Sequence, residues 1–274
     1  MQYEIVIADP AKNITILVLS PVEDRAEAAK ALLGLPGLGA EQVGFVLPPK
    51  AGELWRLEMM GGEFCGNAAR SFGLWVAQTQ GYGGVADIPI SISGMPVPLT
   101  VRVDTQAGTA AVAMPRPQSQ TPVLLSGGLA LPVYAFAGIT HVIVPGISVE
   151  SQRKTWFQEI KAQIESRRPL PQALGVLFYD RETAFMTPWV YVYATDSLVA
   201  ESSCGSGSAA LGAWRYEALE DGEEIFPVVQ PGGVIEVRIW KCRGKIREIA
   251  IGGPVSFHSP PTATCRGGVL GTPW

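Results

Sequence analysis

The sequence is poor in cysteine and histidine. It has four cysteines and two histidines in 274 residues, and no two cysteines form a Cys-x-x-Cys pair. Structural zinc sites usually take four cysteine or histidine ligands at short spacings, so the pattern argues against a metal site. A chain of this length also needs no disulfide scaffold. We therefore expect a cytoplasmic protein with reduced thiols and no metal.

Long apolar runs and an excess of basic charge are also missing. No run of about 18 apolar residues is present, as a membrane span would require. The start, Met-Gln-Tyr-Glu, does not have the regions of a signal peptide. Lysine and arginine number 21 against 25 acidic residues, which gives a formal charge of −4. Nucleic-acid-binding domains usually carry a basic surplus. We expect neither a nucleic acid nor a membrane as partner.

What the sequence does have is apolar residues and many turns. Hydrophobic residues make up 47%, and there are 31 glycines and 22 prolines. Short runs rich in valine and isoleucine, bounded by glycine or proline, predict strands. Such runs are residues 3–8, 14–19, 43–47, 54–59, 99–103, 110–114, 130–136, 141–144, 175–179, 189–193, 234–240 and 246–251.

Four segments are predicted to be helices. The first begins at Ser20-Pro21-Val22-Glu23, which has a serine for the N-cap and a proline at the first helical position, and it ends near residue 34. The second runs from about residue 66 to 78. The third follows residue 148 and ends before Pro169, and the fourth runs from about residue 205 to 219.

A proline-rich stretch, residues 115–122, predicts a boundary between two domains. We assign residues 1–117 to an N-terminal domain and residues 118–250 to a C-terminal domain. Residues 251–259 are expected to return to the N-terminal domain. Residues 260–274 contain glycine and proline without periodicity, and we expect them to be loop or disordered.

The strongest signal is an internal repeat centred on two cysteines. Residues 65–75 read CGNAARSFGLW, and residues 204–214 read CGSGSAALGAW. The cysteine, the next glycine, a glycine eight positions later and a tryptophan ten positions later coincide at an offset of 204 − 65 = 139 residues. This spacing predicts a chain of two similar structural halves rather than a solenoid of many repeats.

Each copy places a thiol just before an apolar helix. The unpaired N–H groups at a helix start can bind an anion, and the same positive end favours the thiolate, so we expect both thiols to be unusually acidic. A lone free cysteine is usually an inert buried residue. Two cysteines in matched, glycine-flanked positions, each after a polar turn, favour a functional pair.

Two thiols on opposite sides of a ligand suggest inversion at carbon. If the two halves face each other, one thiolate removes a proton from Cα and the opposite thiol returns one to the other face. Helix-start N–H groups stabilise the charge that develops on the carboxylate. This chemistry requires no pyridoxal phosphate, and we expect no cofactor.

The two cysteine motifs resemble the active-site signatures of diaminopimelate epimerases, which belong with proline racemases, hydroxyproline epimerases and phenazine-biosynthesis isomerases. The match of elements covers most of residues 1–257. The resemblance implies an α/β (α+β) fold of two pseudo-symmetric domains, each a mixed, largely antiparallel sheet wrapped around a central helix. It also implies cofactor-independent catalysis by Cys65 and Cys204 on a small amino acid. A homodimer is compatible with these expectations.

The resemblance also assigns substrate-binding residues. Asn13 matches an asparagine after the first strand, and Gln42 matches a glutamine that helps to bind substrate. His141 falls where the family has Gly-Asn-Pro-His, although a single histidine in an apolar strand is often structural. Glu201 stands close before the second cysteine, where a solvent-exposed turn residue is the simpler interpretation. The remaining residues, expected to bind the α-carboxylate, are Gly66, Asn67, Gly205 and Ser206.

The sequence departs from diaminopimelate epimerases at the distal end of the substrate. Those enzymes have a Glu-Arg pair about nine residues before the second cysteine, where this chain has Thr195-Asp196. A distal carboxylate would lose its bidentate partner. Four aromatic residues are candidates to line the altered pocket, although core packing is the simpler role for most: Phe45, Phe178, Tyr191 and Tyr193. The run Met-Met-Gly-Gly-Glu-Phe-Cys-Gly-Asn particularly resembles histidine racemases of opine-type metallophore pathways, which favours a single amino acid such as histidine.

Three alternatives remain open from the sequence. One is a diaminopimelate epimerase, converting the LL form to the meso form, with a divergent distal site. Another is a phenazine-type isomerase, against which the presence of both cysteines argues, because the first is replaced in that branch. The third is a non-catalytic amino-acid-binding protein or a thiol-redox protein, in which Cys65 and Cys204 could pair on oxidation.

Overall fold

A computed structural model describes residues 3–50, 52–146, 150–217 and 220–258, with the Glu217 side chain excluded. The described chain divides into two compact units. One unit contains the chain up to Val112 and again from Gly253, and the other contains residues 113–252. The predicted tail, residues 260–274 with Cys265, lies outside the described residues, as does Leu219.

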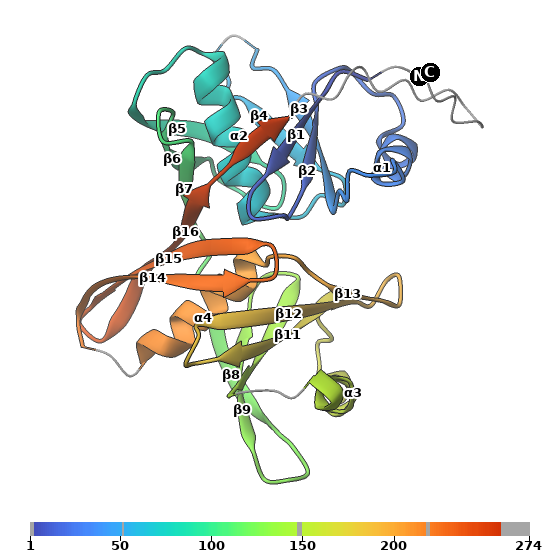
Figure 1. Cartoon of the computed structure of the whole chain (residues 1–274), viewed down its shortest axis with the longest axis vertical. Coiled ribbons are helices and arrows are strands. Elements are labelled where there is room, and N and C mark those ends of the chain that lie inside the picture. Colours follow the sequence, from blue (N-terminus) through green and yellow to red (C-terminus); the bar gives the residue numbers. More distant parts are fainter. Residues whose placement is uncertain (1–2, 51, 147–149, 218–219, 259–274) are drawn as a thin grey trace. The chain divides into compact units, whose positions relative to one another are not determined.

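The first unit contains two helices and eight strands among the described residues (Figure 1). In chain order they are β1 (Ile5–Asp9), β2 (Thr15–Val18), α1 (Arg25–Leu33), β3 (Gln42–Leu47), β4 (Arg56–Met59), α2 (Gly66–Thr79), β5 (Val85–Ile92), β6 (Leu99–Asp104), β7 (Thr109–Ala113) and β17 (Ser256–His258). Neighbouring strands pair in the order β17-β1-β2-β3-β4-β5-β6-β7. The pairs β2–β3 and β4–β5 are parallel, and the others are antiparallel.

The second unit repeats this order with one extra strand (Figure 1). Its elements are β8 (Gln118–Leu124), β9 (Ala130–Ala135), β10 (Ile139–Pro145), α3 (Glu150–Glu165), β11 (Ala173–Asp180), β12 (Phe185–Val192), β13 (Ser197–Ala200), α4 (Gly205–Glu217), β14 (Gly222–Gln230), β15 (Gly233–Cys242) and β16 (Lys245–Pro254). The order is β8-β9-β10-β11-β12-β14-β15-β16, and β13 pairs with β12. The parallel pairs, β10–β11 and β12–β14, fall at the positions of those in the first unit. The mixed α+β fold predicted from the sequence is confirmed.

One helix in each unit packs closely on its sheet. α2 contacts β1, β5 and β6, and α4 contacts β10 and β15. A Cβ on Gly73 of α2 would lie 2.5 Å from Val101 of β6, and one on Gly212 of α4 would lie 2.7 Å from Ile239 of β15. The repeated glycine therefore lets each helix approach its sheet. The apolar helix residues Phe72, Leu74 and Leu211 are fully buried, and Trp214 is half-buried.

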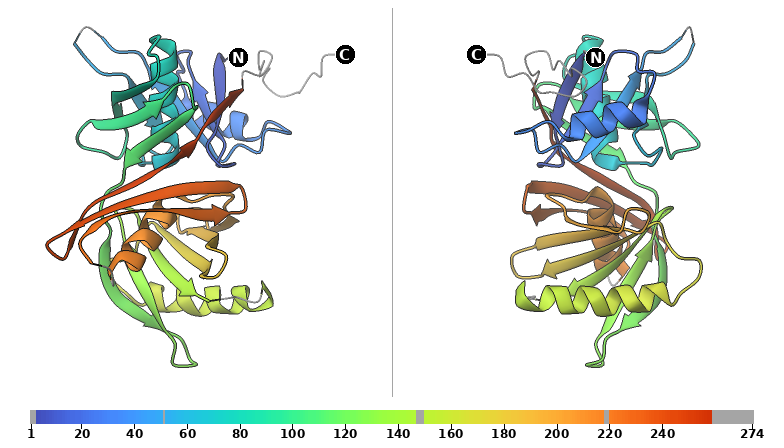
Figure 2. Two further views of the ribbon diagram at one scale, coloured as in Figure 1. Left: turned by 60° about the vertical axis from the view of Figure 1, so that its left-hand side comes forward. Right: turned by 90° about the vertical axis from the view of Figure 1, so that its right-hand side faces the viewer.

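The other two helices cover separate hydrophobic cores. α1 contacts β3 and places Ala28, Ala29 and Leu32 in the core of the first unit. α3 lies along the sheet of the second unit (Figure 2) and contacts β8 and β11. Its residues Phe157, Ile160 and Ile164 belong to the core of that unit. None of the helices among the described residues is long and apolar enough to cross a membrane.

One local prediction was wrong. Ser20 does not cap α1, because Asp24 is the N-cap and accepts a hydrogen bond from Glu27 N at 2.9 Å. The Ser20 hydroxyl instead accepts from Glu4 N at 3.2 Å. The proline-rich stretch, predicted as a domain boundary, contains the first half of β8, whose register shifts between Gln120 and Val123, around Pro122.

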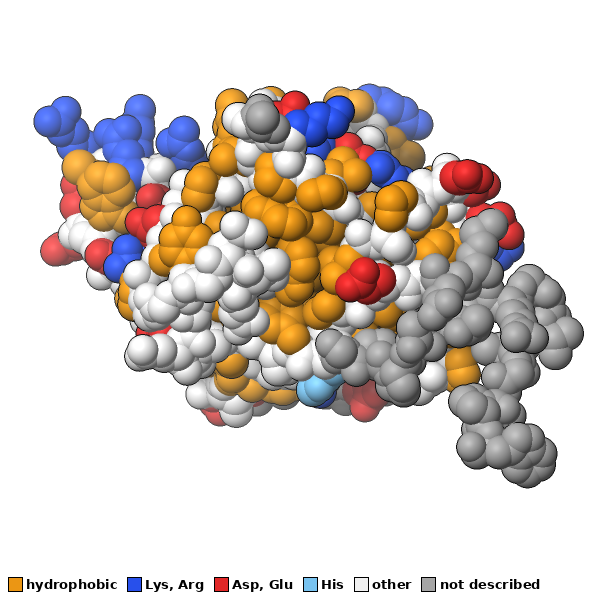
Figure 3. Space-filling model, turned by 90° about the horizontal axis from the view of Figure 1, so that it is seen from above, with side chains coloured by type: hydrophobic (Ala, Val, Ile, Leu, Met, Phe, Trp, Pro, Cys, Tyr) orange, Lys and Arg blue, Asp and Glu red, His pale blue; other side chains and the backbone are white. Residues whose placement is uncertain are grey.

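On the face that Figure 3 shows, hydrophobic and uncharged polar side chains fill the middle, and most charged side chains lie toward the edge. Nucleic-acid-binding surfaces usually carry a continuous basic region. The absence of a nucleic-acid partner stays a prediction.

Candidate active site

Cys65 caps the central helix of the first unit with its own sulfur. The residue has extended backbone angles, with φ −125° and ψ 117°, and its Sγ accepts a hydrogen bond from Ala68 N at 3.4 Å. The Cys65 carbonyl accepts from Ala69 N at 2.9 Å and so begins the helix. The thiol thus occupies the position at which a helix start binds an anion.

Three carboxamides predicted to bind substrate lie together in this unit. Asn13 precedes β2, Gln42 opens β3, and Asn67 lies in the first turn of α2. Asn13 Oδ1 accepts from Gln42 Nε2 at 3.0 Å and from Asn67 Nδ2 at 3.1 Å. Gln42 also hydrogen-bonds the Cys65 sulfur, which favours the thiolate. The structure therefore brings the predicted residues of this half into one network around the thiol.

A fully buried arginine supports this network. Arg70 Nε donates to Asn67 Oδ1 at 3.1 Å. Its Nη1 donates to the carbonyls of Gly253 and Pro254 at 3.0 and 3.2 Å, where the chain returns to this unit. Burial lowers the pKa of Arg70 to about 10, against the opposing effect of charge on Cys65 and Asp9. Arg70 therefore joins the helix that carries the thiol to the returning strand.

Cys204 begins the central helix of the second unit in a matching way. Its Sγ accepts from Gly207 N at 3.4 Å and lies 3.6 Å from Ser206 Oγ. Its own N–H donates to Gln230 Oε1 at 2.7 Å. Cys204 is 5% exposed, whereas Cys65 is half-buried. Both predicted cysteines thus place sulfur against the N–H three residues later.

His141 lies in β10, completely buried, and reaches Ser206. Its Nε2 is 2.9 Å from Ser206 Oγ, and its ring packs edge-on against Phe136. Burial lowers the pKa of His141 to about 3, so the imidazole is neutral near pH 7. When Nε2 carries the proton, His141 donates to Ser206, whose hydroxyl is then directed to donate to the Cys204 sulfur. His141 therefore contacts the start of α4 through Ser206.

Glu201 follows β13 and is only partly exposed. Its N–H donates to the Pro188 carbonyl at 3.0 Å, which holds the residue beside β12. The Glu201 carboxylate is near enough to Cys204 to raise the pKa of that thiol through its charge and through a hydrogen bond. Glu201 is therefore not simply a solvent-exposed turn residue.

The prediction of unusually acidic thiols was wrong. Desolvation raises the pKa of Cys65 to about 11 from a reference of 9.0, although hydrogen bonds from Ala68 and Gln42 lower it. Desolvation, followed by the charge of Glu201, raises the pKa of Cys204 well above the same reference. The helix-start N–H groups do favour the thiolates, but burial outweighs them.

The aromatic residues considered for a distal pocket are core residues. Phe45 belongs to the core beneath α1, while Phe178 and Tyr191 belong to the core beneath α3, with Tyr193 packed against it. The Tyr191 hydroxyl donates to Asp196. The residues that stand in place of the family's Glu-Arg pair therefore hold a turn beside a core tyrosine.

Sequence reasoning missed several residues that contact the cysteines or their helix starts. Arg70 and Ser208 lay within the motifs and could have been singled out. Ser93, directly after β5, and Gln230, at the end of β14, lie far from the motifs in sequence and gave no signal. Gly66 and Gly205 are buried at the first positions of α2 and α4. The catalytic and binding roles of all the named residues stay predictions. In the described part of the chain, no group of three or more histidine, cysteine, aspartate or glutamate side chains could hold a metal ion.

Comparison with known proteins shows the family. Residues 3–263 match the model of a family described as the histidine racemase CntK N-terminal domain. A histidine racemase of Fusobacterium nucleatum (strain ATCC 23726) is 31% identical over 261 residues, covering 91% of this chain and 92% of that protein. A histidine racemase of Staphylococcus aureus (strain Mu50) is 28% identical over 258 residues, covering 90% and 92%.

Solved structures with less sequence similarity share the fold. A hydroxyproline epimerase from Agrobacterium vitis has a TM-score of 0.63 at 12% identity, over 94% of this chain and 93% of its own. A phenazine biosynthesis PhzF family protein from Enterococcus faecalis has a TM-score of 0.64 at 14% identity, over 97% of this chain and 100% of its own. At these identities the comparison concerns the fold alone.

Proposed function

We infer that histidine is the substrate of this chain, because the chain belongs to the histidine racemase family and is therefore an amino acid racemase, an isomerase. One structural observation supports the chemistry. In both units a thiol caps the central helix and accepts the N–H three residues later, at 3.4 Å in each case. A two-base inversion at Cα requires two such acid–base groups.

We propose that the helix starts bind the substrate α-carboxylate. N–H groups at a helix start, together with its dipole, favour a carboxylate. Asn67 and Ser206 occupy equivalent positions two residues after the cysteines. Asn67 is hydrogen-bonded to Asn13 and Arg70, and Ser206 is hydrogen-bonded to His141. These contacts fix the polar side chains before substrate arrives, which favours binding in one orientation.

In the proposed reaction the thiols act on opposite faces of Cα. The active form has one thiolate and one thiol. The thiolate takes the Cα proton and becomes a thiol, while the opposite thiol gives its proton to the other face and becomes a thiolate. Negative charge that develops on the carboxylate is stabilised by the helix-start donors. The two sulfurs supply both proton transfers, so we propose a reaction without pyridoxal phosphate.

The residues expected near the side-chain end of the substrate favour histidine over diaminopimelate. Thr195 and Asp196 stand where diaminopimelate epimerases have a Glu-Arg pair. A second amino-acid head group needs a charged, bidentate partner for its carboxylate, whereas a neutral imidazole does not. We further propose a reducing, cytoplasmic environment, because the mechanism needs Cys65 and Cys204 unpaired, as they are in the structure.

The direct test is proton exchange at Cα. The protein is incubated in deuterated water with L-histidine, with LL-diaminopimelate and with a panel of other L-amino acids, followed by mass and chiral analysis. We expect D-histidine that carries one deuterium at Cα, and little turnover of diaminopimelate. Formation of meso-diaminopimelate with no D-histidine would contradict the substrate assignment, and no exchange with any amino acid would contradict the racemase assignment.

The roles of the thiols are tested by Cys65→Ser and Cys204→Ser. Racemisation should be lost in each, since a serine hydroxyl is a very weak base near neutral pH. Each variant keeps one thiolate, which can still take the Cα proton from one enantiomer of a β-chloro analogue. The Cα–Cβ double bond then forms as chloride leaves with the bonding electrons. The two variants should prefer opposite enantiomers; a shared preference would show that the thiols do not act on opposite faces.

A further inference from the structure

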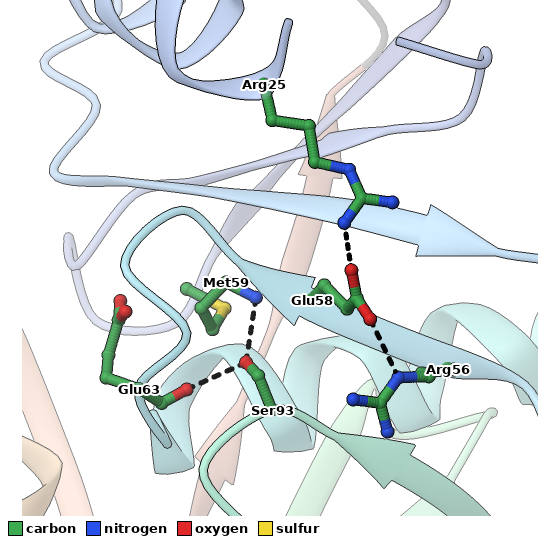
Figure 4. A network of polar contacts seen from close by, with 6 residues as sticks. All are labelled: Arg25, Arg56, Glu58, Met59, Glu63 and Ser93. Carbon is green, nitrogen blue, oxygen red and sulfur yellow. Dashed lines mark hydrogen bonds and ion pairs between the residues drawn. The ribbon is translucent and has the colours of Figure 1, made fainter. Parts of the chain in front are cut away.

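Each cysteine is preceded by a short segment that a distant turn holds in place. In the first unit this turn is Ser93-Gly94, directly after β5, the strand that follows α2. Ser93 Oγ accepts from Met59 N at 2.9 Å and donates to the Glu63 carbonyl at 2.8 Å (Figure 4). Ser93 is 8% exposed, and its own N–H donates to the Leu57 carbonyl at 3.0 Å. The hydroxyl therefore ties both ends of the loop between β4 and α2 to the end of β5.

Gly94 allows this contact by its size and backbone conformation. It has a φ of +73°, and a Cβ there would lie 2.3 Å from Phe64 N and 2.7 Å from Glu63 C. Only glycine lets the turn approach the backbone so closely. Phe64 directly precedes Cys65, so the position of the turn sets the direction from which the chain enters α2.

The second unit uses the equivalent turn with different side chains. Gln230 ends β14, the strand that follows α4. Its Oε1 accepts from Cys204 N at 2.7 Å and its Nε2 donates to Ser208 Oγ at 3.0 Å. Ser208 Oγ in turn donates to the Cys204 carbonyl at 2.7 Å, so both sides of the cysteine are held. Gly232 N then donates to the Ser202 carbonyl at 2.8 Å.

The two turns contact the same position relative to the cysteine. Glu63 and Ser202 each stand two residues before a cysteine, and each carbonyl accepts a hydrogen bond from the turn after the strand that follows the central helix. We propose that Ser93 and Gln230 are positioning residues for the two thiols, each serving the cysteine of its own unit. Neither side chain needs to touch substrate, since each acts through the backbone that carries the sulfur.

Loss of the Ser93 contacts should make the position of the Cys65 sulfur less fixed, and loss of the Gln230 contacts should do the same for Cys204. In each case the other cysteine should be unchanged. The contacts keep the sulfurs at sites where burial disfavours the thiolate, so a freed segment exposes the sulfur and makes it more reactive. The same displacement removes the sulfur from its working position and lowers turnover. Because the effect on turnover rests on the proposed racemase function, reactivity of the thiols is measured separately.

The test compares Ser93→Ala and Gln230→Leu with two control variants in the full chain. Thr105→Val removes a hydroxyl that donates to the Gly84 carbonyl at 3.3 Å. Gln163→Leu removes a side chain that bonds the Leu124 backbone on β8. Iodoacetamide labelling rates of Cys65, Cys204 and Cys242 are followed by peptide mass spectrometry, and kcat and KM for histidine are measured in parallel.

We expect Ser93→Ala to speed labelling of Cys65 at least about threefold and leave Cys204 unchanged, and Gln230→Leu to do the reverse. For both variants kcat should fall about tenfold with KM changed less than about twofold. The controls should match the original protein. If Ser93→Ala fails to fold, Ser93→Thr is used instead, and if Gln230→Leu fails to fold, Gln230→Glu is used. Both replacements keep the acceptor atom, so we expect smaller changes in labelling rate and kcat at the same cysteine.

Equal changes at both cysteines, or none at either, would overturn the proposal. A selective labelling change supports it even if the original protein does not racemise histidine, and in that case only the proposed function fails.

Discussion

The two thiols differ in the groups that surround them, and this difference affects their protonation. Cys65 is half-buried and receives N–H groups from Ala68 and Gln42. Cys204 is more deeply buried and has the Glu201 carboxylate beside it, which opposes ionisation further. In both, desolvation is the largest cause of the raised pKa. Near pH 7 both thiols are therefore protonated, and the proposed mechanism requires one of them to ionise before it takes the Cα proton.

This protonation state predicts a racemase that is faster in alkaline solution. Below its pKa, the thiolate fraction of a thiol rises about tenfold for each pH unit. Since the pKa of Cys65 is about 11 and that of Cys204 is raised above 9.0, kcat/KM for histidine should rise steadily from pH 7 to pH 9. Initial rates of D-histidine formation across this range measure the effect.

A matched control for the pH profile is Cys242→Ser, which removes the third thiol of the described chain. The variant should show the same rise as the original protein. A rate that is constant between pH 7 and pH 9, or that falls, would mean that no thiol has to lose its proton in the free enzyme.

At the scale of elements, the repeated glycine in each central helix has a purely structural reason. Gly73 faces Val101 of β6, and Gly212 faces Val237 and Ile239 of β15, with no room for a methyl group. The tryptophans of the repeat also pack on aromatic neighbours, Trp75 on Phe72 and Trp214 on Tyr179. The glycine and tryptophan of each motif thus pack the central helix against its neighbours, and the residues at the start of that helix form the candidate site.

Adding a methyl group should therefore destabilise either unit. We expect Gly73→Ala and Gly212→Ala each to lower the free energy of unfolding by about 1–3 kcal/mol, the usual cost of overpacking a core. Urea denaturation measures the change. The controls are Gly83→Ala and Gly127→Ala, since a Cβ at either position has no neighbour within 4 Å. These should change the free energy by less than about 0.5 kcal/mol. If Gly73→Ala and Gly212→Ala lowered the free energy of unfolding no more than the controls do, close packing of the helices on their sheets would be contradicted.

Proline explains why two strands, β5 and β14, were not predicted from the sequence. β5 and β14 each contain a proline, Pro89 and Pro227, and proline within an apolar run usually argues against a strand. Both prolines are exposed, and they occur in strands at equivalent places of the two units. The helices were more predictable, since α2 begins at Gly66 and α4 at Gly205 as expected.

The candidate site was predictable only where it is local in sequence. The cysteine motifs and their glycines repeat visibly, and the resemblance supplied Asn13 and Gln42. Gln230 could not be found in this way, because it lies 26 residues after Cys204 in the sequence. Only the pairing of β14 with β15 brings the turn at Gln230 to Cys204. The pKa directions were also beyond the sequence, since burial is a property of the folded unit.

At the scale of the whole molecule, the duplication extends beyond the motifs to every layer of the fold. Each unit has a helix between the strands of each parallel pair, and the second helix carries the cysteine. The chain passes from the first unit to the second after Val112 and returns after Gly252. β16 includes the returning residues, and Arg70 binds the carbonyls of Gly253 and Pro254. One chain therefore carries both halves of the duplicated arrangement.

In the proposed mechanism one chain supplies both thiols, so no second copy is needed to provide the two bases. We predict that co-expressing Cys65→Ser and Cys204→Ser chains, with different tags, yields no more D-histidine than either variant alone. Each chain would lack one base, and mixing chains cannot restore the missing sulfur within it. The species that carries both tags, if one forms, is isolated by two affinity steps and assayed beside a wild-type and Cys65→Ser mixture prepared in the same way. Racemisation restored in the doubly tagged species would mean that the two sulfurs of a working site come from different chains.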